Sequence, residues 1–225
     1  MNSDYFNDPR PDVQMLLPAG ARRVLDIGCA SGALGAALKE KGVPHVSGIE
    51  QNPDAARAAR ARIDRVVEGD LSNIDPPFQA EEFDCIIFAD VLEHIPDPEC
   101  ALSRYLHFLA PQGAVIISVP NMRFYAVLLR LIFDRWSYSD SGVRDRTHLR
   151  IFTRRSLQEM LARVGLRTEQ VHRNYRLVED QSRIGRFGAC ATQLIRNIVA
   201  PVLFRNLMAF QYVVRARRPL KRAEV

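Results

Sequence analysis

The sequence predicts an α/β fold in which a mostly parallel sheet carries helices on both of its faces. Two observations indicate this fold. Short apolar strands alternate with helical segments at the spacing of strand–helix–strand units, and a glycine-rich turn joins the first strand to the first helix. The stretch from Val24 to Leu38, VLDIGCASGALGAAL, contains that strand, the turn and the start of the helix. Glycine at such a turn indicates a backbone that passes close to a ligand.

In the first half of the chain, strands and helices follow one another regularly. Gly42 is suited to end the first helix, and Asn52 followed by Pro53 is suited to begin the second. The segment FDCIIFAD is apolar on both faces, as a central parallel strand should be. We expect strands at 22–28, 45–50, 64–70, 83–90 and 114–120, and helices at 33–42, 52–62 and 96–113.

After Pro120 the pattern becomes less regular. Ser156, with Glu159 three positions later, predicts a capped helix start. A long helical segment is expected to break near Pro201. We expect helices at 122–136, 156–165 and 184–208, strands at 167–175 and 209–219, and a loop at 138–153.

Composition is that of an ordinary globular protein, because 47% of the 225 residues are hydrophobic and 25% are charged. The four cysteines, at 29, 85, 100 and 190, form no C-x-x-C pair, which argues against a disulfide framework and a zinc site. The polar N-terminus does not resemble a signal peptide, and no apolar run is long enough for a membrane-spanning helix. We therefore expect a cytoplasmic protein with one domain over 1–225.

Charge is distributed unevenly along the chain. Residues 1–140 hold 13 Lys or Arg and 20 Asp or Glu, whereas residues 141–225 hold 18 and 6. A basic C-terminal third suits an anionic partner such as phosphate or acidic lipid, although a general preference for Arg would give the same bias. The basic residues are interleaved with apolar ones and form no recognisable nucleic-acid-binding module, so we expect no nucleic-acid partner.

Two classes of cofactor are bound by a strand, a glycine turn and a helix. The dinucleotide fingerprint G-x-G-x-x-G fails here, because Ala30 stands at its second glycine. The segment LDIGCASG instead resembles the first motif of class I S-adenosylmethionine-dependent methyltransferases. SGIEQNP, VVEGDL, FDCIIFADVLEHIPDP and LAPQGAVIISVPN resemble the family's next four motifs, in the same order over residues 22–121.

The resemblance implies a Rossmann-like, seven-stranded, mostly parallel sheet that binds S-adenosylmethionine through residues 22–121, with the substrate side and helical lid insertions in 122–225. In that family the glycine loop holds the methionine half of the cofactor, an acid at Glu50 holds the ribose, and Asp70 with Leu71 flanks the adenine. Asp26 could instead cap the following helix, Gly35 serve only packing, and Cys29 be merely a small turn residue. The implied cofactor-binding residues are Asp26, Gly28, Cys29, Ala30, Gly32, Glu50, Gln51, Asp70, Leu71, Ala89 and Asp90.

Two histidines are candidates for the chemistry. A hydroxyl acceptor holds its proton tightly, so a base near neutral pKa is useful. His148 lies in RDRTHLRIFT, which resembles a segment of methyltransferases found with bacterial glycan genes. His94 follows the fourth strand in the E-H-I pattern that quinone-biosynthesis O-methyltransferases share. Either histidine could instead have a structural role, with His94 capping a helix and His148 bonding backbone.

Substrate binding is expected from the lid. The insertions at 122–143 and 176–208 mix apolar residues with Arg, which suits a helix packed on the domain or one resting on a membrane surface. We assign no metal ligands, and Asp90 and Asp145 are the only acids of interest for one. The expected substrate-binding residues are Asn121, Tyr125, Arg144, Asp145 and Arg146.

The leading hypothesis is O-methylation of a sugar, a lipid-linked sugar or another small-molecule hydroxyl. A quinone or lipid-type acceptor at the membrane surface, a non-catalytic cofactor-binding scaffold, and an NAD-dependent oxidoreductase are alternatives. The oligomeric state stays open, a homodimer included.

Overall fold

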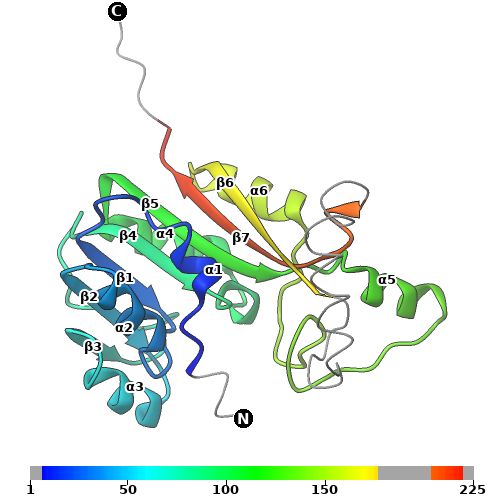
Figure 1. The fold of residues 1–225 in the computed structure, drawn as a ribbon, viewed down its shortest axis with the longest axis horizontal. Coiled ribbons are helices and arrows are strands. Elements are labelled where there is room, and N and C mark those ends of the chain that lie inside the picture. Colours follow the sequence, from blue (N-terminus) through cyan, green and yellow to red (C-terminus); the bar gives the residue numbers. More distant parts are fainter. Residues whose placement is uncertain (1–6, 177–203, 220–225) are drawn as a thin grey trace, which may run out of the picture.

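The structure, a computed structural model, describes residues 7–176 and 204–219 and contains one seven-stranded sheet (Figure 1). The strand order is β3-β2-β1-β4-β5-β7-β6, and only the pairings of β7 with β5 and with β6 are antiparallel. The strands are β1 (Arg23–Ile27), β2 (His45–Glu50), β3 (Arg65–Glu68), β4 (Phe83–Ala89), β5 (Leu109–Pro120), β6 (Arg167–Tyr175) and β7 (Ala209–Arg217).

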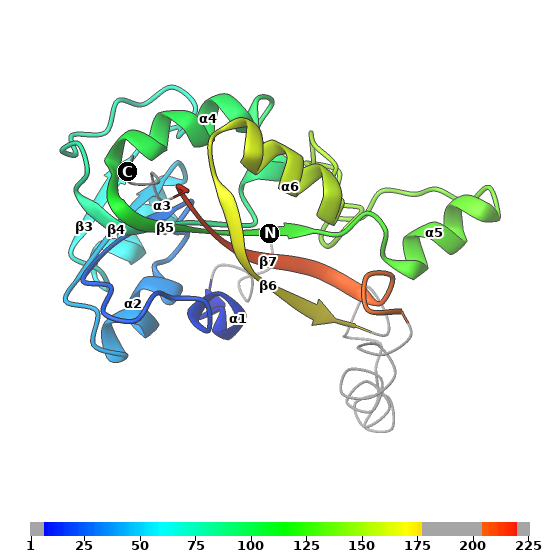
Figure 2. The ribbon, with the colours of Figure 1, turned by 90° about the horizontal axis from the view of Figure 1, so that it is seen from above.

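Helices cover both faces of this sheet, as the sequence predicts. Figure 2 shows α4 and α6 on one face and α1 and α2 on the other. Each face has its own apolar core, because parallel strands bury side chains on both sides. The helices are α1 (Pro11–Gln14), α2 (Ala33–Glu40), α3 (Pro53–Arg60), α4 (Pro98–Tyr105), α5 (Tyr125–Ile132) and α6 (Arg154–Arg163), with 3₁₀ turns at Leu92–His94 and Leu106–Phe108.

The expected helix signals act largely as predicted. The Asn52 side chain accepts hydrogen bonds from the backbone N–H groups of Asp54 and Ala55, which caps α3. Gly35 serves packing, since a Cβ at this position would lie 2.5 Å from Ile63 Cγ2 and 3.0 Å from Val46 Cγ1. Because glycine has no Cβ, α2 can lie this close to Val46 of β2 and to Ile63.

Two local predictions are wrong, and one short helix was not predicted. The helix expected over 96–113 ends at Tyr105, and the chain passes through a 3₁₀ turn into β5, which begins at Leu109. The N-cap of α6 is Thr153, and Ser156 is the third helical residue, whose hydroxyl accepts from the Thr153 backbone N–H in a reciprocal capping box. The short α1 has no clear sequence signal, because tertiary contacts hold it.

The second half of the chain builds the edge of the sheet and a projecting lid. The strands β6 and β7 match the expected segments 167–175 and 209–219, apart from the last two residues of the latter. Both views show α5 projecting beyond the end of β5 (Figures 1 and 2). Most of the helix expected over 184–208 lies outside the described residues, and so does Cys190. Within 7–176 and 204–219, no helix has the length and apolar character needed to cross a bilayer.

Candidate cofactor and acceptor site

The candidate site lies at the carboxyl ends of the parallel strands. Strand order reverses between β1 and β4, and open α/β sheets bind ligands in the crevice at such a point. The loops that follow β1, β2 and β4 meet there, which brings Asp26, Glu50 and Asp90 to one edge of the sheet.

The loop after β1 turns through three residues with positive φ. Gly28, Ala30 and Gly32 have φ values of 71°, 48° and 79°. A Cβ on Gly28 would lie 2.7 Å from Val91 Cγ2, and one on Gly32 would lie 3.1 Å from Ala59 Cα. These two glycines therefore allow both the turn and the close approach of Val91 and Ala59. The sequence analysis explained the glycines by a ligand alone.

Ala30 occupies a left-handed conformation that costs an alanine about 1 kcal/mol. Its backbone N–H donates to Glu50 Oε2 at 2.9 Å, and the Asn52 N–H donates to Glu50 Oε1 at 2.8 Å. Glu50 is only 7% exposed, so its carboxylate is held in place between the loops after β1 and β2. Glu50 thus fixes the shape of the glycine loop, and it retains lone pairs for a ligand hydroxyl.

Asp26 is a buried carboxylate with an unsatisfied oxygen. The residue is 2% exposed, and its Oδ1 has no hydrogen-bond partner. Burial raises the pKa of Asp26 to about 7, with Glu50 adding to the rise and Arg10 opposing it. An orphaned buried acceptor at the strand end indicates a place for a ligand donor such as a hydroxyl or an ammonium.

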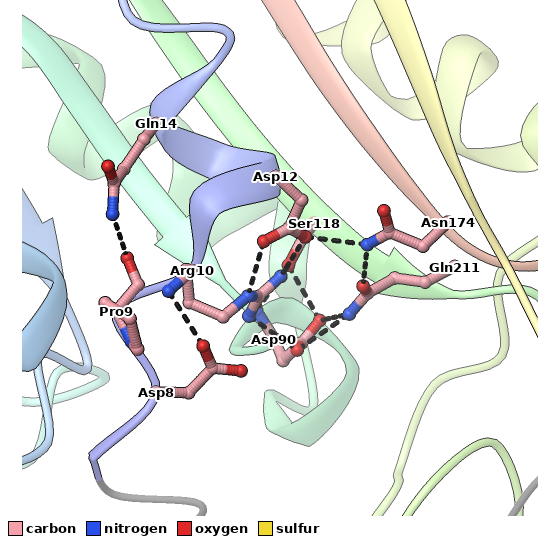
Figure 3. A network of polar contacts seen from close by, with 9 residues as sticks. All are labelled: Asp8, Pro9, Arg10, Asp12, Gln14, Asp90, Ser118, Asn174 and Gln211. Carbon is pink, nitrogen blue, oxygen red and sulfur yellow. Dashed lines mark hydrogen bonds and ion pairs between the residues drawn. The ribbon is translucent and has the colours of Figure 1, made fainter. Parts of the chain in front are cut away.

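A salt-bridge network lies beside these acids, and Figure 3 shows it. Arg10, from the segment before α1, donates to Asp90 Oδ2 at 2.8 Å and forms a two-point pair with Asp12 at 3.1 and 3.0 Å. Gln211 of β7 and Ser118 of β5 also donate to the Asp90 carboxylate. Burial acts to lower the pKa of Arg10, but Asp90 and Asp12 outweigh it and raise this pKa above its ordinary value.

The other residues expected from the sequence to bind the cofactor have varied surroundings. Gln51 and Asp70 are exposed, and the Asp70 carboxylate accepts from the Ser72 N–H and the Asn73 amide. Leu71 packs against the core, and its carbonyl accepts from the Tyr105 hydroxyl at 2.8 Å. Cys29 turns its side chain into the core beside Gly48. Ala89 is half-buried directly before Asp90.

The two predicted catalytic histidines lie together, although they are far apart in sequence. The ring centroids of His94 and His148 are 4.9 Å apart. Burial, with a further contribution from His94, lowers the pKa of His148 below its ordinary value. The lowered pKa favours the neutral imidazole, which is the form that can accept a proton.

A cavity of ≈ 80 Å³ adjoins His148 under the lid. Trp136 and Tyr138 line it, along with the polar residues Arg144 and Asp145. Hydrogen bonds from Thr147 hold the pKa of Asp145 below its usual value, although burial acts to raise it. A mixed wall of aromatic and charged groups suits an acceptor with an apolar body and polar substituents.

Some residues expected to bind substrate contact other parts of the protein instead. Asn121 is fully buried and its amide nitrogen donates to the carbonyls of Asn206 and Ala209, so it supports backbone and does not reach a ligand. Arg146 is exposed and pairs with Asp140 at 2.7 Å. Tyr125 is half-buried at the start of α5. Burial therefore corrects the assignment of Asn121, whereas the roles expected for Tyr125 and Arg146 stay predictions.

Sequence reasoning missed several residues of the site. Arg10 lies between two prolines in a polar segment, and its φ of 52° places it in an uncommon conformation that no local motif announces. Ser118 and Gln211 lie inside strands, and Glu93 looks like part of a helix-capping pattern. Their role comes from contacts between segments far apart in the chain.

The chain resembles known proteins over most of its length. A family model described as a methyltransferase domain matches residues 1–171. A ubiquinone biosynthesis O-methyltransferase of Xylella fastidiosa is 32% identical over 125 residues, which cover 52% of this chain and 49% of that protein. The chain thus spans about half the length of this curated relative.

Solved structures share the fold. A Thermotoga maritima protein, described as an S-adenosylmethionine-dependent methyltransferase and a possible histamine N-methyltransferase, superposes with a TM-score of 0.63 at 20% identity. The match covers 94% of this chain and 88% of that one. An S-adenosylmethionine-dependent methyltransferase of Mesorhizobium loti gives 0.62 at 19% identity, over 92% and 96%. These likenesses confirm the fold class expected from the sequence.

The buried carboxylate makes the protein's stability depend on pH. The folded-state pKa of Asp26, about 7, exceeds the ordinary 3.8, so ionisation destabilises the fold increasingly between those values. We expect Asp26→Asn to raise the free energy of unfolding at pH 8 by roughly 1–3 kcal/mol, and by much less at pH 5. Urea unfolding at both pH values measures this, with exposed Asp54→Asn as the control. An equal effect at the two pH values would contradict the assignment.

The Arg10 network should matter far more than a surface ion pair. Arg10→Met removes the cation shared by two acids that are each less than 20% exposed, so we expect a loss of about 2–4 kcal/mol of unfolding free energy. Arg57→Met breaks the exposed pair with Asp54 and should cost under about 0.5 kcal/mol. Urea unfolding of both variants tests the contrast, and similar small losses would show that the network contributes little.

Proposed function

The chain belongs to the methyltransferase-domain family, and on that premise we propose that it is an S-adenosylmethionine-dependent O-methyltransferase acting on a small hydroxylated acceptor. The observation that carries the proposal is the pairing of two parts at one edge of the sheet. One is a cradle with an orphaned buried carboxylate at Asp26, and the other is a neutral histidine, His148, beside a cavity.

The cradle fits the donor chemically. S-adenosylmethionine carries an ammonium, ribose hydroxyls and a carboxylate, and the site offers hydrogen-bond acceptors in Asp26 and Glu50 and a cation in Arg10. The backbone of Gly28 to Gly32 passes beside them without bulky side chains. When bound, the donor supplies a methyl group already activated on sulfonium.

His148 is the residue best placed to deal with the acceptor's proton. Its Nδ1 lies 3.3 Å from the Val143 carbonyl, a contact that leaves Nε2 as the basic nitrogen. The cavity lies against this ring, so an acceptor hydroxyl bound there could pass its proton to Nε2. His94 packs edge-on against His148 and restricts its orientation.

The methyl acceptor is proposed to be a phenolic, quinone-type compound. The curated relative is named for ubiquinone biosynthesis, which supports a phenolic, quinone-type acceptor. The aromatic walls at Trp136 and Tyr138 suit a ring of that kind. The sugar acceptor that led the sequence hypothesis has no support from these relatives, so we propose the quinone-type alternative.

An acceptor of that type would be reached at a membrane surface, and α5 has the features for contact with one. Ile132 and Phe133, at the end of α5, are 74% and 68% exposed. Arg130 and Arg135 lie exposed beside them, which suits anionic headgroups above buried apolar side chains. We propose that this surface, residues 129–138, rests on anionic lipid.

Calorimetric titration tests the proposed function directly. S-adenosylmethionine should bind and NAD should not. With a catechol acceptor, His148→Ala should lower turnover by about a hundredfold or more while changing donor affinity less than about twofold. The exposed histidine variant His107→Ala is the control. Binding of NAD alone would overturn the proposal, and donor binding with no transfer to catechol or hexose acceptors would favour a scaffold.

Vesicle sedimentation tests the membrane contact. The wild-type protein should sediment with phosphatidylglycerol-containing vesicles, less so at high salt. The double variant Ile132→Ser and Phe133→Ser should bind at least about tenfold more weakly, because two apolar side chains no longer enter the interface. Met15→Ser, which removes an exposed apolar residue elsewhere, is the matched control. Wild-type protein left in the supernatant would contradict the proposal.

A further inference from the structure

We propose that Glu93, His94 and His148 form a binding site for one divalent transition-metal ion. One ligand atom from each residue lies within 4.8 Å of the others. Two imidazoles and one carboxylate are the ligand set that catalytic zinc and non-haem iron sites use when they keep open positions. No motif in the sequence links His148 to the other two residues, because it lies more than 50 positions after them.

The fold holds the two segments of this site together. Glu93 and His94 lie in the 3₁₀ turn that follows β4, and His148 lies in the loop between α5 and α6. The backbone N–H groups of Leu149 and Arg150 both donate to the Glu93 carbonyl, at 2.8 and 2.9 Å. The separation of the two segments is therefore set by main-chain hydrogen bonds.

In both histidines Nδ1 faces a backbone carbonyl, which leaves Nε2 available to a metal ion. His94 Nδ1 lies 3.2 Å from the Thr147 carbonyl, and His148 Nδ1 lies 3.3 Å from the Val143 carbonyl. A carbonyl oxygen can only accept, so each Nδ1 carries the proton and each Nε2 retains its lone pair. Metal-ligating histidines use this second-shell arrangement to fix ring orientation.

The buried carboxyl group of Glu93 supports the metal site independently of the histidines. The residue is 1% exposed, and its Oε2 has no hydrogen-bond partner. Buried carboxylate oxygens almost always have a partner, so this orphaned atom calls for a proton or a cation beside it. One carboxylate oxygen of Glu93 lies within 4.8 Å of a ring nitrogen of each histidine, so a single cation placed there would serve all three side chains.

The neighbouring acids are already committed to other partners. Asp90 accepts from Arg10, Ser118 and Gln211, and Asp145 accepts from Thr147. The ligand set is thus two nitrogens and one oxygen, which favours Zn²⁺, Mn²⁺, Fe²⁺ or Co²⁺ over Mg²⁺ and Ca²⁺, the ions that prefer oxygen ligands.

A metal ion at this site would activate the acceptor hydroxyl in the cavity beside His148. Resting on the proposed O-methylation, we infer that an acceptor hydroxyl takes an open coordination position on the side of the cavity that His148 lines. A bound divalent ion lowers the pKa of such a hydroxyl, and the proton is released to solvent. In the metal-bound protein His148 would be a ligand and the ion would activate the hydroxyl, whereas in the metal-free protein His148 itself accepts the proton.

Titration of the full chain with Co²⁺ tests the site without relying on activity. After treatment with chelator and dialysis, wild-type protein should bind one Co²⁺ per chain and show the visible absorption of a nitrogen-ligated ion. Glu93→Gln, His94→Ala and His148→Ala should each weaken binding at least about tenfold. His107→Ala, an exposed histidine outside the site, should bind as wild type does.

Binding that is absent, or equal in wild-type and Glu93→Gln protein, would overturn the metal site. Glu93→Gln could unfold the protein, so Glu93→Asp is measured beside it, together with circular dichroism of every variant. S-adenosylmethionine titration of the metal-free protein separates the two proposals. Donor binding without Co²⁺ binding contradicts the metal site alone, whereas Co²⁺ binding without donor binding contradicts the proposed function alone.

Discussion

The ion pair between Arg10 and Asp90 holds the functional edge of this sheet together. It joins the segment before α1 to the end of β4, and Ser118 and Gln211 extend it to β5 and β7. Four segments far apart in the chain therefore meet at the carboxyl ends of the strands, where open α/β folds place their ligands. Because the charges are mostly buried, each depends on the others for its solvation.

The same edge contains groups that the fold leaves unsatisfied. Asp26 Oδ1 and Glu93 Oε2 are buried without partners, although the large majority of buried side-chain polar atoms are hydrogen-bonded. Asp26 comes just before the glycine loop in the sequence, and Glu93 comes just before His94. Burying these carboxylates lowers the free energy of unfolding. That loss has a functional reason if Asp26 binds the methyl donor and Glu93 binds a metal ion.

The sheet core and the lid are built separately. The two large apolar clusters lie on the faces of the sheet, while Phe124, Val127, Val143 and Phe210 form a third, smaller cluster under α5. The third cluster lies apart from the two on the sheet faces, and Phe210, which belongs to β7, joins it to the sheet.

The sequence by itself determined β1 to β4, α2, α3, the glycine loop, and the placing of Asp26 and Glu50 at strand ends, but it did not predict α1 or the boundary between α4 and β5. These features depend on local periodicity, caps and turns, which neighbouring residues specify. Only the tertiary structure decided that Arg10 reaches Asp90, that Asn121 supports backbone, and that Glu93 and His94 meet His148. Those contacts join residues separated by many positions, and their geometry follows from sheet order and chain crossings, which local sequence does not encode.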